Sequence, residues 1–146
     1  MLVRVTKKFD FEMAHALDWH DGKCKNLHGH TYKLIITLKG HINQDLSQTN
    51  SGMVIDFGAV KDLVKNLIVE RFDHCTMLYD KSPILEHISK LEYLKLEKVP
   101  FQPTAENLVV YIQSIIAETL PSFVILQKVV LFETETSSAE WHLEDN

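Results

Sequence analysis

The sequence predicts an α+β fold of four strands and two long helices in the order ββααββ. Three observations support this prediction: apolar and polar residues alternate near the N-terminus, recur at helical spacing in the middle, and alternate again near the C-terminus. Strands at both ends with helices between them suit an antiparallel four-stranded sheet that carries the helices on one face. A chain of 146 residues can also bury a hydrophobic core, so we expect a single domain over residues 1–146.

Two N-terminal strands are predicted over about residues 2–14 and about residues 30–40. In the first strand, Phe9, Phe11 and Met13 lie two residues apart and therefore share one face. The loop DWHDGKCKN between the strands is polar, and the segment NQDLSQTNSG after the second strand is rich in turn-forming residues. These two segments delimit the predicted strands.

A long helix is predicted over about residues 57–71, because apolar residues recur there every three or four positions. Asp56 is a suitable N-cap for this helix, since its carboxylate can accept hydrogen bonds from the first free backbone N–H groups. The segment PILEHISKLEYLKLEK, residues 83–98, predicts a shorter helix.

A second long helix should begin at Pro103 or Thr104 and continue to about Leu120, where the next proline stops it. Two final strands are predicted over about residues 124–134 and about residues 138–143. A four-stranded sheet has two exposed edges with unpaired backbone groups. Association with further copies of the chain would cover them.

The composition argues against several classes of function. The chain carries a formal net charge of -5, whereas proteins that bind nucleic acid or anionic membranes normally present a basic patch. The N-terminal MLVRVTKKFDFE has charged residues where a signal peptide needs an apolar core, and no apolar run reaches the length of a membrane span. With only two cysteines, Cys24 and Cys75, we expect reduced thiols and a cytoplasmic location.

Four side chains that bind zinc readily lie within sixteen residues: His15, Cys24, His28 and His30. His28 and His30 are separated by one residue at the start of a predicted strand, so both rings would point to one face. His15 ends the preceding strand on its apolar face, and pairing of the two strands could bring the three imidazoles together. Three protein ligands leave a fourth position open, as in catalytic zinc sites.

Two other interpretations remain open on spacing alone. Cys24 could be the fourth ligand, which would give a closed structural site of one thiolate and three imidazoles. The histidines could also be ordinary packed or surface residues, because short motifs carry false positives.

Further motifs follow the histidines along the chain. An Asp-His pair occupies positions 73 and 74, the sequence PTAEN begins at Pro103, and Glu133-Thr134 ends a predicted strand. Together with FEMAH and CKNLHGH, this series resembles the 6-pyruvoyltetrahydropterin synthase family over nearly the whole chain. The family includes the bacterial 6-carboxytetrahydropterin synthases of queuosine biosynthesis, and the compact CKNLHGH loop is most similar to that branch.

The resemblance implies the tunnelling fold, in which trimers of ββααββ subunits form barrels. Two trimers stack as a homohexamer, a dimer of trimers, with active sites at the subunit interfaces. The resemblance also implies a Zn2+ cofactor bound by His15, His28 and His30, and assigns Cys24 as the base that takes a proton from the substrate. A thiol suits this role beside a zinc ion or a histidine, both of which favour the thiolate.

Three more positions acquire roles from the resemblance. Asp73 and His74 would form a proton relay in which the carboxylate orients the imidazole. Glu133, on the inward parity of Leu131, would anchor the pterin, whose ring N–H and 2-amino group suit a bidentate carboxylate. Thr104 matches a region of pterin contacts. Read without the family, these residues could equally be a chance Asp-His pair, an exposed strand end and a helix cap.

The implied activity is that of a zinc-dependent lyase acting on a small molecule, 7,8-dihydroneopterin triphosphate. The products would be 6-carboxy-5,6,7,8-tetrahydropterin, acetaldehyde and triphosphate. One alternative is a 6-pyruvoyltetrahydropterin synthase, which eliminates triphosphate only and uses the same residues. A second alternative, of another class, is a non-catalytic assembly module stabilised by zinc. The segment 81–102 is longer than in compact members of the family and could rim the pocket.

Overall fold

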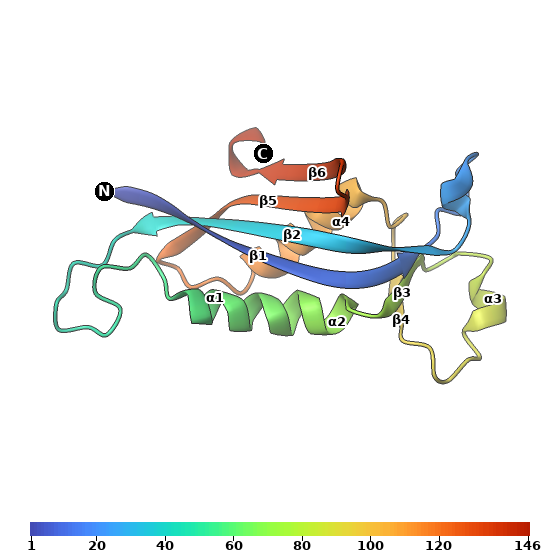
Figure 1. Ribbon diagram of the computed structural model, residues 1–146, viewed down its shortest axis with the longest axis horizontal. Helices are drawn as coiled ribbons and strands as arrows, with labels where there is room; N and C mark the ends of the chain where they lie inside the picture. Colours follow the sequence, from blue (N-terminus) through green and yellow to red (C-terminus); the bar gives the residue numbers. More distant parts are fainter.

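The computed structural model describes residues 1–146 and consists of a curled sheet with its helices packed on one face (Figure 1). Two long antiparallel strands form the centre of the sheet, β1 (Leu2–His15) and β2 (His28–His41). β5 (Val124–Thr134) pairs with β2, and β6 (Ser137–His142) pairs with β5, both antiparallel. These four strands confirm the predicted strands, with ends that differ by at most two residues.

The sheet has six strands rather than the four predicted, in the order β4-β3-β1-β2-β5-β6. β3 (Cys75–Tyr79) pairs parallel with the end of β1, and β4 (Leu96–Val99) pairs parallel with β3. β3 shows no alternation because four of its five residues are buried, and β4 has only four residues. Neither strand therefore has a periodic pattern that sequence can detect.

The helix predicted over residues 83–98 is wrong. Only Leu85–Ile88 forms a single helical turn, α3, and the end of the segment is strand β4. None of the four α3 residues is buried, so the turn has no apolar face to hold a longer helix against the core. The backbone of β4 instead pairs with β3. Just before β4, the Lys95 carbonyl accepts a hydrogen bond from the Thr76 N–H at 2.8 Å.

The first long helix is confirmed as a continuous helical run below β1 in Figure 1. It consists of α1 (Phe57–Val64), a π-helical segment (Lys65–Val69) and α2 (Glu70–Phe72). Asp56 is its N-cap, as predicted, since its Oδ1 accepts from the backbone N–H of Gly58 at 2.6 Å.

The second long helix, α4 (Ala105–Ala117), begins after its N-cap Thr104 and ends three residues before the predicted end at Leu120. Both long helices pack on the same face of the sheet, as predicted, where they share one apolar core with β1, β2 and β5. No helix of this protein combines the length and the apolar character that a membrane span requires. The largest fully buried side chains of the core include Tyr32, Phe72, Leu34, Ile36, Leu38, Ile68, Met77, Ile112, Ile116 and Leu131.

The Asp56→Ala variant should be less stable by about 1 kcal/mol, because it removes the acceptor that caps the first turn of α1. Chemical denaturation followed by circular dichroism measures this difference. Asp62→Ala is the matched control, since Asp62 lies exposed on the same helix and has no side-chain hydrogen bond. Equal loss of stability in both variants would contradict a capping role.

Candidate metal centre and active site

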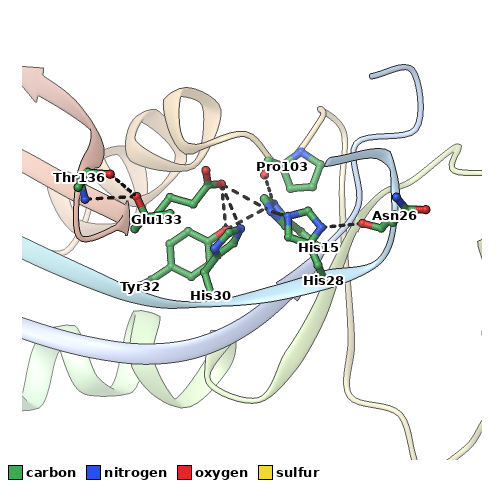
Figure 2. A network of polar contacts seen from close by, with 9 residues as sticks. His15, Asn26, His28, His30, Tyr32, Pro103, Glu133 and Thr136 are labelled. Carbon is green, nitrogen blue, oxygen red and sulfur yellow. Dashed lines mark hydrogen bonds and ion pairs between the residues drawn. The ribbon is translucent and has the colours of Figure 1, made fainter. Parts of the chain in front are cut away.

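Three histidines from the two central strands converge at one end of the helix-covered face (Figure 2). His15 and His28 are direct cross-strand partners, and His30 lies opposite Met13 in the same register. Because directly paired residues and residues two apart share a face, the register alone brings the three rings together. Their ligand atoms all lie within 4.8 Å of one another.

Backbone carbonyls orient two of these rings. The Nδ1 of His15 lies 2.7 Å from the Pro103 carbonyl oxygen, and the Nδ1 of His28 lies 2.6 Å from that of Asn26. A carbonyl can only accept, so each Nδ1 carries the proton and each Nε2 presents a lone pair. Metal-binding histidines are typically held in this way by a second hydrogen bond.

The remaining nitrogen atoms fit a zinc ion. The Nε2 atoms of His15 and His28 lie 3.2 Å apart, close to the ~3.3 Å that separates two ligands in a tetrahedral site with Zn–N bonds of about 2.0–2.1 Å. The Nε2 of His30 is buried and has no hydrogen-bond partner. Two facing lone pairs and an unpaired buried nitrogen are unfavourable alone and become favourable around a cation. The donor set therefore fits zinc.

Burial keeps two of the imidazoles neutral. Desolvation lowers the pKa of His15 and of His30 below the usual value of histidine, although the nearby Glu133 carboxylate opposes this shift in both. The hydrogen bond with the Pro103 carbonyl also raises the pKa of His15, but by less than burial lowers it. A neutral imidazole is the form that binds a metal, so protons compete little for this site near neutral pH.

Glu133 lies beside the three histidines and points inward from β5, on the side that the sequence indicated. Its Oε1 is 3.5 Å from the Nε2 of His15 and 3.9 Å from that of His30. The buried Tyr32 hydroxyl donates to the same oxygen at 3.5 Å. Burial raises the pKa of Tyr32 far above its usual value, so this phenol stays protonated and acts as a donor.

Cys24 is separate from this cluster. It lies half-buried in a short helical turn, Lys23–Lys25, between β1 and β2, and the group of side chains that could hold a metal contains only the three histidines. The loop is closed by a hydrogen bond from the Leu17 N–H to the Cys24 carbonyl at 3.0 Å. This geometry favours a three-histidine site with an open position over a closed site with a fourth, thiolate ligand.

Asp73 and His74 form a pair at the end of α2. Asp73 Oδ2 lies 3.0 Å from His74 Nδ1, and Asp73 Oδ1 accepts from the Glu12 N–H at 2.8 Å. The latter hydrogen bond is the main reason why the pKa of Asp73 is lowered. The His74 side chain is 77% exposed, and no hydrogen bond or ion pair joins this pair to the three histidines or to Cys24.

Thr104 is a helix cap, which was the simpler of the two interpretations of this residue in the sequence. Its hydroxyl accepts from the Asn107 N–H at 3.3 Å and caps α4. It also follows Pro103, whose carbonyl orients His15, so the start of α4 lies beside the three-histidine cluster.

Sequence reasoning missed two parts of the site. Tyr32 lies two residues after His30 and therefore shares its face, so strand parity could have found it. The Pro103 and Asn26 carbonyls carry no signal in the sequence, because any residue supplies a backbone oxygen and only the fold brings it to a ring.

Comparison with known proteins identifies the family of this chain. A sequence model of the family described as 6-pyruvoyl tetrahydropterin synthase matches residues 4–144. The chain belongs to this family. It is 38% identical to a 6-carboxy-5,6,7,8-tetrahydropterin synthase of Haemophilus influenzae, over 96% of this chain and 99% of that protein. It is 33% identical to a protein of the same name from Rickettsia bellii, over 95% of this chain and 99% of that one.

Solved structures share the fold. An uncharacterized protein from Wolinella succinogenes superimposes with a TM-score of 0.81 at 22% identity, covering 98% of this chain and 99% of its own. A Plasmodium vivax 6-pyruvoyl tetrahydropterin synthase superimposes with a TM-score of 0.73 at 22% identity, covering 97% and 98%. The predicted family, the fold of its single chain and the predicted class of enzyme, a lyase of this family, are confirmed. The zinc ion, the roles of the residues and the hexamer stay predictions.

The His30→Ala variant should lose most of its bound zinc, because it removes one of three ligands and leaves two. Metal content after dialysis against a trace of zinc, measured by inductively coupled plasma mass spectrometry, tests this. His20→Ala is the control, since His20 lies in the loop outside the cluster. Full zinc occupancy in His30→Ala would show that the ion binds elsewhere.

The metal-free protein should lose stability as the pH falls below about 6.5, the usual pKa of histidine in an unfolded chain. His15 and His30 have lowered pKa values in the folded state, so the unfolded state takes up protons first and acid favours unfolding. The loss should begin well above the range in which Asp73 titrates, since the pKa of that carboxyl is also lowered. Denaturation between pH 8 and about pH 5 measures it, and a flat profile would contradict the neutral, buried state of the rings.

Proposed function

We propose that this protein is a zinc-dependent 6-carboxytetrahydropterin synthase. It would convert 7,8-dihydroneopterin triphosphate and water into 6-carboxy-5,6,7,8-tetrahydropterin, acetaldehyde and triphosphate. The observation that carries this proposal is the convergence of three histidine rings beside an inward carboxylate, with the Nε2 lone pairs of His15 and His28 fixed by backbone carbonyls. The names of the relatives that are at least 30% identical over most of the chain favour the carboxy product.

His15, His28 and His30 would hold the zinc ion. When bound, zinc would act as a Lewis acid that polarises the side-chain oxygen atoms of the substrate and acidifies the adjacent C–H bond. The carbonyls of Pro103 and Asn26 fix the orientation of the His15 and His28 rings, so these ligands would be preorganised for the ion. Fixed ligand rings would in turn limit how far the substrate can move relative to the base.

Glu133 would bind the pterin ring. Its carboxylate lies next to the histidines and can accept from the ring N–H and the adjacent amino group at once. Tyr32 donates to Oε1 from the core and so fixes the position of the carboxylate. Thr104, at the start of α4, would add a contact with the pterin on the same side.

Cys24 would remove the proton from the substrate carbon, and the electron pair would move into the pterin ring, which becomes tetrahydro without an external reductant. Triphosphate then leaves from the side chain. Asp73 and His74 would move protons between oxygen atoms of the side chain, with the carboxylate orienting the imidazole. Addition of water and cleavage of the carbon–carbon bond release acetaldehyde and leave the 6-carboxyl group.

We further propose that the complete site forms between copies of the chain in a homohexamer. Within one chain, the exposed His74 makes no hydrogen bond or ion pair with the histidine cluster or Cys24. The outer strands β4 and β6 also leave two sheet edges that neighbouring subunits would cover. The active site would then combine the zinc ligands of one subunit with the Asp73–His74 pair of another.

Incubation of zinc-loaded protein with 7,8-dihydroneopterin triphosphate tests the reaction, with products followed by mass spectrometry. We expect a 6-carboxy pterin together with acetaldehyde, and both should fall at least about 100-fold in Cys24→Ala through loss of the base. Cys75→Ala is the matched control, because Cys75 is buried in β3 and its pKa is raised to about 12.

Each other outcome has a defined meaning. A pyruvoyl product without acetaldehyde would assign the protein to the 6-pyruvoyltetrahydropterin synthases. No turnover by folded, zinc-loaded protein would overturn the proposed reaction and favour the assembly module for this chain. Mixing Cys24→Ala with His74→Ala subunits, unfolded and refolded together, tests the shared site: activity should reappear only if the two residues come from different chains.

A further inference from the structure

The turn that carries Asp73 and His74 has an unusual backbone. His74 has a φ of 60°, and it is the one residue other than glycine with a positive φ. Residues with a Cβ adopt this left-handed conformation uncommonly, and they keep it only where surrounding contacts hold it. The contacts around this turn therefore decide where the Asp73–His74 pair points.

Strand β1 holds the turn from one side. The Glu12 N–H donates to Asp73 Oδ1 at 2.8 Å, and the Glu12 carbonyl accepts from the His74 N–H at 2.6 Å. One backbone residue of β1 thus binds both members of the pair. These bonds place the turn relative to β1, but they leave the carbonyls at the end of α2 without an intrahelical partner.

Lys95 holds the turn from the other side. Its Nζ donates to the Glu70 carbonyl at 2.7 Å and to the Asp73 carbonyl at 2.8 Å. Its own carbonyl accepts from the Thr76 N–H at 2.8 Å. A cation at the C-terminal end of a helix is favourable, and here it binds two of the carbonyls that end α2.

The position of Lys95 is itself supported. Lys95 directly precedes β4, and Glu97 on that strand forms an ion pair with Arg71 of α2. The same guanidinium donates to the Tyr111 hydroxyl of α4 at 2.8 Å and lies over the Phe72 ring. These contacts attach the segment 81–102 to the helices and bring Lys95 back onto the turn.

From these contacts we infer that Lys95 is a positioning residue, which fixes the Asp73–His74 pair in the geometry that proton transfer needs. The inference rests on the proposed function, in which this pair moves protons. It also assigns a role to the segment 81–102. The segment returns to the sheet as β4 and supplies Lys95, which we call the clamp because it holds the turn of Asp73 and His74.

The test is the Lys95→Met variant, which keeps the apolar stem of the side chain and removes all three donors. With 7,8-dihydroneopterin triphosphate, kcat should fall by about tenfold or more through loss of alignment, whereas KM and zinc content should stay at the wild-type level. Lys98→Met is the matched control, because Lys98 is exposed on β4, three residues after Lys95, and has no side-chain hydrogen bond or ion pair. A kcat for Lys95→Met within about twofold of that of Lys98→Met would overturn the inference.

Hydrogen exchange separates this inference from the proposed function. In the absence of substrate, the His74 amide should exchange faster in Lys95→Met than in wild type or Lys98→Met, because the turn loses one of its two supports. An unchanged exchange rate would overturn the clamp even if wild-type protein turns over the substrate. If Lys95→Met does not assemble, Lys95→Ala, which also has no side-chain donor, takes its place with the same expected results.

Discussion

The antiparallel pairing of β1 with β2 is the constraint on which the rest of this structure depends. Its register makes His15 and His28 direct partners and places His30 opposite Met13, so three imidazoles share one face at the end of the sheet. A slip of one residue would move all the side chains of one strand to the other face. The apolar residues farther along both strands prevent that slip, because they fill the core beneath α1 and α4. The hydrophobic core therefore sets the geometry of the three-histidine cluster.

Backbone groups at the edges of this core complete the site. The Pro103 carbonyl that orients His15 belongs to the turn that starts α4, and the cap of that helix is the next residue, Thr104. Tyr32 reaches the inward carboxylate of Glu133 from within the core itself. Any change in how α4 packs on the sheet would thus move the carbonyl that orients the His15 ring, which ties the packing of the fold to the geometry of the candidate site.

The candidate site residues fall into two groups within one chain. The three histidines and Glu133 form one group on the helix-covered face, and the Asp73–His74 pair forms another at the end of α2. The second group is exposed and is held by the backbone of Glu12 and by Lys95 rather than by the first group. Such a division suits an enzyme whose site is assembled from more than one subunit, each of which carries both groups in a preorganised form.

The sequence by itself determined the elements of this protein whose apolar residues follow a regular period along the chain. Alternation and helical spacing located four of the six strands and both long helices, and strand parity predicted that His15, His28 and His30 share one face. Only the tertiary structure decided the rest. The short strands β3 and β4 form through parallel pairing with segments far away in the chain, so they leave no local period. The carbonyls that orient the rings and the Lys95 clamp are likewise contacts between distant segments, and only the folded chain brings them within hydrogen-bond distance.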